Sequence, residues 1–396
     1  MQSPNLIHGL PSRARPLWPS AIAAALLLAA CSQDGPPPPP PPPPVSDEAM
    51  AAVSADPGVE RESLARAVDA LFARDDLGET RALVVMRNGE IAAERYGEGF
   101  DADTPLVGWS MSKTVTAVLI GMLVADGRMR LDDPAPVAIW QRPGDPRGEI
   151  TLRHLLQMRS GLRHEEKAEP VYTSPEVRMM FLDGRDDMAG WAEAQPLAHE
   201  PGATFAYSTP TSVILADIAT GLIAPDASAQ TNPRSRADAR QHAMADFLEA
   251  RLAVPLGLDS MVGEYDASGT LVGGSSIWAD ARDWAKFGEF LRHGGSVRGA
   301  QIVPRGWVEF MTSASPRAPD YGGQVWLNRP SGGTRDELFA ADGPDDAFAL
   351  IGHLGQYVIV VPSRGLTIAR LGKTDQEQRA ALVEALAEIV ALYPSR

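Results

Sequence analysis

A serine and a lysine three residues apart are the residues of this 396-residue chain whose types and spacing point most directly to chemistry. They are Ser110 and Lys113, in the run GWSMSKT over residues 108–114. Positions i and i+3 of a helix share a face, so the lysine amine can approach the serine hydroxyl. A serine hydroxyl becomes a strong nucleophile when a neighbouring base takes its proton, and burial lowers the pKa of a lysine toward that role. The run therefore predicts a nucleophile and its base.

The Ser-x-x-Lys pair could also occur by chance at the start of an ordinary helix. With four lysines and 25 serines in the chain, about a quarter of one Ser-x-x-Lys match is expected at random. In the structural alternative, Ser110 caps the helix and Lys113 extends its amine to solvent.

Two further segments carry polar side chains that could complete a site. Tyr207 and Thr209 lie two residues apart just before a predicted helix. The tyrosine could relay a proton, although a partly buried ring with a solvated hydroxyl is the commoner arrangement. Later, His353 and Gly355 precede Gln356, where a predicted strand begins. A glycine there lets a substrate lie against the backbone, and a free N–H could stabilise an oxyanion.

In the order Ser-x-x-Lys, Tyr-x-polar, His-x-Gly, these segments resemble the penicillin-recognising serine hydrolases. That group includes class C β-lactamases, D-alanyl-D-alanine peptidases, related esterases and 6-aminohexanoate-dimer hydrolases. Residues 150–162, 255–261 and 273–283 add to the resemblance, which covers about residues 60 to 390.

The resemblance implies a role for each residue. Ser110 would attack a carbonyl and form an acyl-enzyme, while Lys113 and Tyr207 move its proton. Backbone N–H groups of Ser110 and Gln356 would hold the oxyanion. The other implied binding residues are His353, Gly355 and Thr209.

Two departures shift the expected activity within this group. Class C enzymes usually carry Asn two positions after the tyrosine and Lys-Thr-Gly at the strand, whereas this chain has Thr209 and His353-Leu354-Gly355. The resemblance is therefore closer to the esterase and aminohexanoate-dimer branches than to β-lactamases or D-Ala-D-Ala carboxypeptidases. The run Lys373-Thr374-Asp375 follows the last predicted strand and lacks the glycine.

Other classes fit the sequence less well. An α/β-hydrolase would need Gly-x-Ser-x-Gly, and the last glycine is missing at Ser112. A zinc hydrolase would need clustered ligands, but the seven histidines are scattered, and residues 164–166 (His-Glu-Glu) are interpreted as a solvated loop. We therefore expect neither a metal nor a cofactor. A non-catalytic envelope lipoprotein with the same fold stays open.

The elements that must position these residues form an α+β pattern. An Asn-Gly turn of type I′ predicts a hairpin over residues 82–96, and the almost entirely apolar stretch 113–125 predicts a buried helix. Further helices are expected near 59–72, 152–158, 213–222, 243–252, 281–292 and 376–392, with strands near 324–327, 347–351, 357–361 and 366–371. This predicts a β-lactamase/transpeptidase-like fold. An antiparallel sheet from residues 58–110 and 265–396 is flanked by N- and C-terminal helices and interrupted by an all-α region, 111–264.

The first residues predict export. Arg13 and Arg15 precede the short apolar stretch 21–30, which ends in Leu-Ala-Ala-Cys31 and resembles a bacterial lipobox. The predicted domains are a lipoprotein signal peptide with its lipobox cysteine (1–31), a proline-rich tether (32–57) containing nine consecutive prolines, and the hydrolase domain (58–396). We expect a lipid anchor on Cys31, the only cysteine, on the periplasmic side of the cell envelope, with the outer membrane as the expected site.

Charge and composition narrow the partners. A formal charge of -15 leaves little basic surface for phosphate backbones, so nucleic acid is not expected as a partner. The expected partners are a small-molecule or short-peptide acyl substrate and, through the lipid anchor, the membrane.

Overall fold

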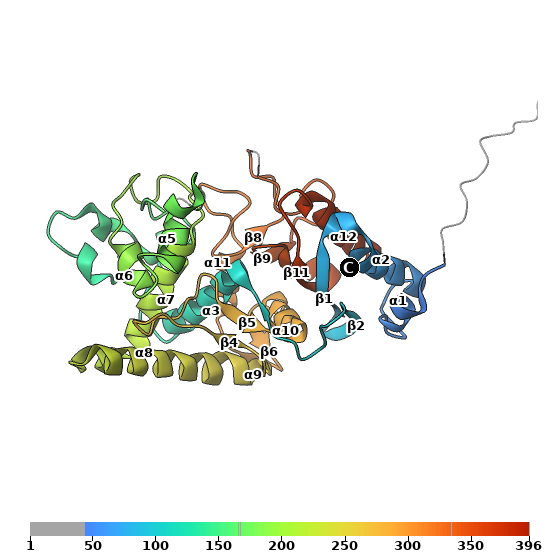
Figure 1. The fold of residues 1–396 in the computed structure, drawn as a ribbon, viewed down its shortest axis with the longest axis horizontal. Coiled ribbons are helices and arrows are strands. Elements are labelled where there is room, and N and C mark those ends of the chain that lie inside the picture. The colour runs from blue at the N-terminus through green and yellow to red at the C-terminus, as the bar shows by residue number, and fades with distance from the viewer. Residues whose placement is uncertain (1–43, 165, 167, 334, 396) are drawn as a thin grey trace, which may run out of the picture. The chain divides into compact units, whose positions relative to one another are not determined.

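A computed structural model describes residues 44–164, 166, 168–333 and 335–395 (Figure 1). The predicted signal peptide and Cys31 lie outside these residues. Among the residues described, no helix is long and apolar enough to cross a membrane.

A six-stranded antiparallel sheet joins strands from both ends of the chain. Its order is β2-β1-β11-β10-β9-β8, so the early hairpin pairs directly with the last strand. Asn88 and Gly89 both have positive φ angles, 54° and 88°, as the predicted type I′ turn requires. The strands are β1 (Glu79–Arg87), β2 (Glu90–Tyr96), β8 (Trp326–Leu327), β9 (Phe348–Gly352), β10 (Gln356–Val361) and β11 (Leu366–Lys373).

Helices cover both faces of this sheet (Figure 1). Ile359 and Val361 point to the face covered by α2 (Arg61–Ala73) and α12 (Arg379–Leu392). Between them, Val360 points to the opposite face, against α10 (Ala281–Arg292). Because water is excluded from both faces, every residue of β10 is buried and the strand is almost wholly apolar.

The middle of the chain is mainly helical and packs around α3, whose residues are buried from Ser112 to Leu123. One short strand, β4 (Val262–Gly263), interrupts the region predicted to be all-α. It forms a small sheet with β5 (Ile277–Ala279) and β3 (Leu106–Val107), and β3 leads into the turn that carries Ser110. The helices of this region are α3 (Ser112–Ala125), α4 (Leu152–Leu156), α5 (Pro175–Phe181), α6 (Met188–Glu193), α7 (Thr209–Ile223), α8 (Pro233–Leu248) and α9 (Val254–Leu256).

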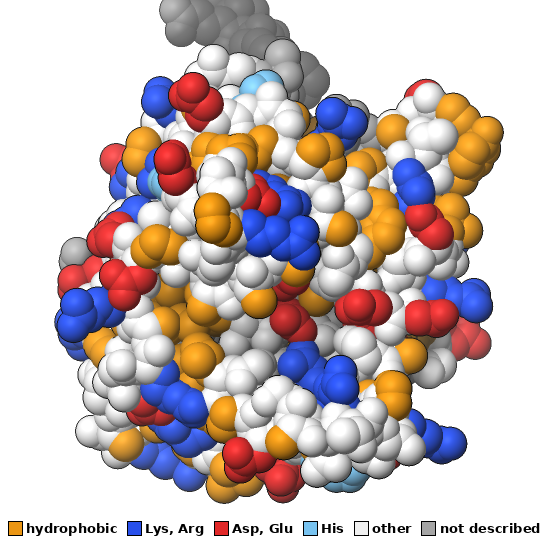
Figure 2. All heavy atoms as spheres, turned by 90° about the vertical axis from the view of Figure 1, so that its left-hand side faces the viewer, with side chains coloured by type: hydrophobic (Ala, Val, Ile, Leu, Met, Phe, Trp, Pro, Cys, Tyr) orange, Lys and Arg blue, Asp and Glu red, His pale blue; other side chains and the backbone are white. Residues whose placement is uncertain are grey.

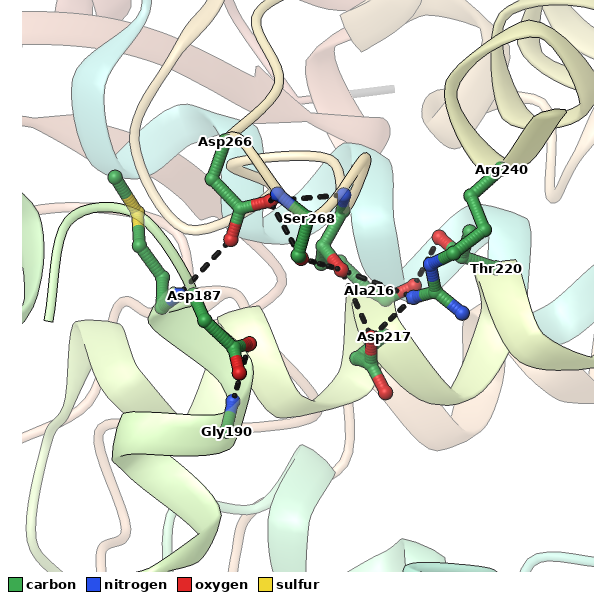
Figure 3. A network of polar contacts seen from close by, with 10 residues as sticks. Asp187, Gly190, Ala216, Asp217, Thr220, Arg240, Asp266 and Ser268 are labelled. Carbon is green, nitrogen blue, oxygen red and sulfur yellow. Dashed lines mark hydrogen bonds and ion pairs between the residues drawn. The ribbon is translucent and has the colours of Figure 1, made fainter. Parts of the chain in front are cut away.

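A buried polar network ties α6, α7 and α8 to the loop before β5 (Figure 3). Asp266 accepts hydrogen bonds from the backbone N–H groups of Met188 at 2.9 Å and Thr270 at 3.0 Å. The Thr270 hydroxyl donates to Asp217 of α7 at 2.8 Å, and Arg240 of α8 pairs with the same carboxylate. These bonds satisfy carboxylates that would be costly to bury alone, and they fix α7, whose first residue is Thr209.

Charges of both signs alternate with apolar side chains over the face drawn in Figure 2. Many surface arginines lie within ion-pair distance of an acid, as in the pairs Arg251–Asp126 and Arg178–Asp183. No extended basic stripe is visible on this face of the described part.

Several predicted boundaries differ from the observed ones. The folded body begins before residue 58: α1 (Asp47–Ala51) is helical, Ala49 is buried, and Val53 pairs with Ala93 of β2. The C-terminal part of the predicted tether therefore belongs to the body, because Ala49 and Val53 bury apolar surface against it. The last helix starts at Arg379 rather than 376, whereas α10 has the predicted bounds. The remaining elements are α11 (Arg305–Met311), β6 (Ser296–Val297) and β7 (Ala300–Gln301).

Candidate active site

Ser110 lies on a tight turn at the N-terminal end of α3. The turn is a 3-10 segment, Trp109–Met111, and Trp109 has a positive φ of 48°, a strained conformation for a tryptophan. Two hydrogen bonds with Ile277 hold it to β5: Gly108 N–H donates to the Ile277 backbone oxygen at 2.8 Å, and Ile277 N–H donates to the Ser112 side-chain Oγ at 3.0 Å. The turn thus presents the Ser110 hydroxyl at the mouth of a rigid, buried helix.

Lys113 is buried, and its amine makes three hydrogen bonds. Its Nζ donates to Ser110 Oγ at 2.8 Å, to Thr209 Oγ1 at 2.9 Å and to the backbone oxygen of Gly274 at 2.8 Å. Only 1% of the lysine is exposed, so it does not extend to solvent. Burial lowers the pKa of Lys113, while Glu166 and Glu176 oppose that shift.

Thr209 joins this amine to two carboxylates. Its hydroxyl lies 2.9 Å from Glu166 Oε1 and 3.0 Å from Glu176 Oε1, and its backbone N–H donates to Glu166 Oε2 at 2.9 Å. Burial raises the pKa of Glu166 to about 7; the Glu176 charge adds to the rise, and Lys113 opposes it. Lys113 therefore contacts the serine directly and is linked to two acids through one threonine.

Tyr207 packs over the lysine within an aromatic cluster. The Lys113 amine lies 5.0 Å from the Tyr207 ring centre, and that ring contacts Trp326 and Tyr321 at centroid distances of 5.3 Å and 5.8 Å. Burial raises the pKa of Tyr207 well above its ordinary value, and a hydrogen bond with Ser110 opposes the rise. The hydroxyl therefore keeps its proton near neutral pH.

The predicted strand residues occupy the turn between β9 and β10, but they are not equivalent. Gly355 faces away from the nucleophile, since a Cβ there would meet Arg370, Thr374 and Leu382. The Gln356 side chain is buried and donates to the backbone oxygens of His353 and Leu354 at 2.9 and 3.0 Å, which fixes the turn.

The glycine that lies against the nucleophile turn is Gly352, which was not predicted. A Cβ on Gly352 would lie 2.2 Å from the Gly108 backbone oxygen, so only glycine allows this approach. The exposed His353 ring stands edge-on to Trp109 at 5.4 Å. The close backbone approach thus comes three residues earlier than Gly355.

The interpretation of residues 164–166 as a solvated loop is wrong for the two that are described. His164 is buried between Thr211 Oγ1 at 3.2 Å and Ala192 O at 3.0 Å, and burial lowers its pKa to about 4. Glu166 is part of the site. Sequence reasoning missed Glu166 and Glu176 because they lie 43 and 33 residues from Thr209, with no shared motif.

Within the described residues, no group of three or more His, Cys, Asp or Glu side chains is arranged to hold a metal ion.

The six-stranded antiparallel sheet with its inserted helical region defines the class of fold, and comparison with known proteins identifies the family. The β-lactamase family profile matches residues 68–392, and the chain belongs to this family. Its α+β fold is the β-lactamase/transpeptidase-like fold that the sequence predicts.

Individual relatives are distant. The 6-aminohexanoate-dimer hydrolase of Paenarthrobacter ureafaciens is 25% identical over 271 residues, covering 67% of this chain and 65% of the relative, less than two thirds of its length. A Bacillus anthracis protein provisionally assigned as a 6-aminohexanoate-dimer hydrolase superposes with a TM-score of 0.61 at 20% identity, covering 82% of this chain and 81% of the other. A family VIII carboxylesterase superposes with a TM-score of 0.57 at 16% identity, covering 83% of this chain and 96% of the esterase. The chain is thus a member of a family of hydrolases.

Proposed function

We propose that this protein is a serine hydrolase that cleaves an ester or amide through an acyl-enzyme on Ser110. The observation that carries the proposal is the 2.8 Å contact between Ser110 Oγ and the amine of Lys113, which is buried at the start of α3. Burial favours the neutral amine, the form that can accept the serine proton.

Each proton transfer of the proposed reaction is assigned to Lys113 or Tyr207. The amine of Lys113 takes the proton of Ser110 as Oγ bonds to the substrate carbonyl carbon, and the carbonyl π electrons move to its oxygen. Tyr207, whose hydroxyl is protonated near neutral pH, donates its proton to the leaving group and is reprotonated by Lys113. Water then attacks the acyl-enzyme by the reverse proton transfers.

We assign the oxyanion site to the backbone N–H of Ser110 together with the end of β9. The close approach of Gly352 to Gly108 and the contact of His353 with Trp109 support the β9 end over Gln356, the residue predicted from sequence. In the register of the sheet, Gln356 pairs with Gly352 on the far side of that turn.

The substrate class follows from the departures in the sequence and from the relatives. Thr209 stands where class C enzymes usually carry asparagine, and the relatives include an amide hydrolase and an ester hydrolase by name. Linear amides and esters are therefore the proposed substrates, ahead of β-lactams and D-alanyl-D-alanine peptides.

Labelling with a fluorescent fluorophosphonate tests the nucleophile. Wild type should label and Ser110→Ala should not, while Ser228→Ala, which removes an exposed serine hydroxyl outside the site, should label like wild type. Equal labelling of wild type and Ser110→Ala would refute the proposal. Loss of labelling without turnover of p-nitrophenyl esters, linear aminohexanoate amides, D-amino amides or a chromogenic β-lactam would favour a binding role.

Export and lipid anchoring through Cys31 are also part of the proposed function. They rest on the sequence alone, on the lipobox and the arginines before the apolar stretch. Full-length protein expressed in a Gram-negative host should incorporate an alkyne-tagged fatty acid, and Cys31→Ser should not. Equal incorporation, or none in either, would contradict the anchor.

A further inference from the structure

A continuous chain of hydrogen bonds runs from the nucleophile to the partly buried acid Glu166. Lys113 Nζ lies 2.8 Å from Ser110 Oγ and 2.9 Å from Thr209 Oγ1, and Thr209 Oγ1 lies 2.9 Å from Glu166 Oε1. The amine donates to the threonine hydroxyl, and that hydroxyl donates to the carboxylate. The contacts that link the amine to this acid run through Thr209.

A hydroxyl at this position can do what an amide cannot. It accepts one hydrogen bond and donates another through the same oxygen, so a proton can enter on one side while another leaves on the other. A carboxamide accepts through its oxygen and donates through its nitrogen, and it does not exchange protons readily. Thr209 is therefore chemically fitted to pass a proton between Lys113 and Glu166.

We infer that Thr209 relays a proton from the Lys113 ammonium to Glu166, so that the lysine is a free amine when substrate binds. The step balances within the chain. Thr209 gives its hydroxyl proton to Glu166 Oε1 and takes one from Lys113 Nζ, which leaves a neutral amine, an intact hydroxyl and a carboxylic acid. The neutral amine then accepts the proton of Ser110. The inference rests on the proposed function, and it makes Thr209 and Glu166 positioning residues that act through Lys113.

Charge in the site favours this distribution of protons. The titratable groups around Glu166 are Glu176 on α5, Lys113 on α3, and the hydroxyls of Tyr207 and Tyr321. Two adjacent carboxylates with one cation would carry a net negative charge away from water, which is costly. Protonation of one acid together with a neutral amine lowers the number of buried charges.

Glu166, rather than Glu176, is the acid that Thr209 holds in the path by two contacts. One oxygen accepts from the Thr209 hydroxyl and the other accepts from the Thr209 backbone N–H at 2.9 Å. Glu176 contacts the same hydroxyl at 3.0 Å. The variant Glu176→Gln therefore removes a neighbouring charge without interrupting the path from Lys113 to Glu166.

The pH dependence of fluorophosphonate labelling tests the relay. In wild type the active form of the Lys113–Glu166 pair holds one proton. The acid limb of the pH profile, where the labelling rate falls as the pH drops, marks the pH at which the pair takes up a second proton. In Glu166→Gln, Lys113 must lose its proton beside a neutral side chain. The pKa of this step is higher than the first pKa of the wild-type pair, because either member of that pair can give up the proton. The limb should move up by about one pH unit. In Glu176→Gln the path is intact and a negative charge is gone, so the limb should move down.

These signs separate the relay from two other roles. If Glu166 acts only through its charge, the limb moves down in both variants, because the loss of an anion lowers the pKa of Lys113. If Glu166 only supports Thr209, Glu166→Gln lowers the rate without moving the limb. Either result overturns the inference.

Variants of Thr209 give a second, independent readout. Thr209→Ser keeps the hydroxyl and should label at nearly the wild-type rate, whereas Thr209→Asn can accept from Lys113 but cannot pass the proton on. We expect Thr209→Asn to label about tenfold or more slowly at neutral pH. An asparagine variant as fast as the serine variant would refute the relay. Failure of the proposed function itself is distinguishable, because wild type and Ser110→Ala would then label alike.

Discussion

Replacement of the buried lysine by methionine is the perturbation whose outcome the structure constrains most tightly. Lys113→Met keeps an unbranched side chain that is one heavy atom shorter, has sulfur in place of one methylene and lacks the amine. The stem therefore keeps its packing within α3 and α7, while Ser110 Oγ, Thr209 Oγ1 and the Gly274 oxygen each lose one hydrogen bond.

The effect on stability should be small because two terms oppose each other. A buried acceptor left without a partner, here the Gly274 oxygen, costs about 1–3 kcal/mol. Against this, the fold no longer has to desolvate an amine, the same effect that lowers the pKa of Lys113. The free energy of unfolding should change by no more than about 2 kcal/mol.

The effect on acylation should be much larger. A positioned general base contributes about 10²–10⁴ in rate, which corresponds to about 3–5 kcal/mol of barrier. The second-order rate of fluorophosphonate labelling measures this loss directly, and thermal unfolding of the same samples measures stability.

A matched control uses the same substitution elsewhere. Lys286 of α10 also donates to a backbone oxygen, that of Gly257 at 2.7 Å, but it lies outside the site. Lys286→Met should label like wild type. Labelling of Lys113→Met within about threefold of wild type would remove this lysine from the mechanism, and a collapse of stability would mean that its role is structural.

Three further outcomes are expected. Tyr207→Phe keeps the ring and should lose about tenfold to a hundredfold in labelling with unchanged stability; an unchanged rate would limit Tyr207 to packing. Gly352→Ala places a Cβ 2.2 Å from Gly108 O and should slow labelling about tenfold or more. Gly306→Ala, which has open space around it, should leave the labelling rate unchanged. Equal labelling rates for the two variants would mean that the end of β9 does not contribute to the site. Burial and two aspartates raise the pKa of Glu193 from 4.5 to about 8, so the fold loses stability as pH rises through that window. Glu193→Gln should therefore raise the Tm at pH 8 but not at pH 4, and an equal effect at both would contradict this linkage.

Local chemistry determined much of this protein from its sequence. Asn88 and Gly89 tolerate positive φ, so the hairpin could be predicted from two residues. The almost entirely apolar run of α3 predicts a buried helix, and the spacing of Ser110 and Lys113 predicts their approach, since residues three apart share a face.

Tertiary structure alone decided what surrounds that pair. Thr209 lies 96 residues from Lys113, and Glu166 lies 43 residues from Thr209, so no periodicity or motif connects them. A glutamate in a polar loop is ordinarily solvated, and the packed start of α7 supplies the hydrogen bonds that allow Glu166 to be partly buried. In the same way, Gly352 rather than Gly355 meets the nucleophile turn because the strand register, which depends on contacts across the whole sheet, sets where β9 ends.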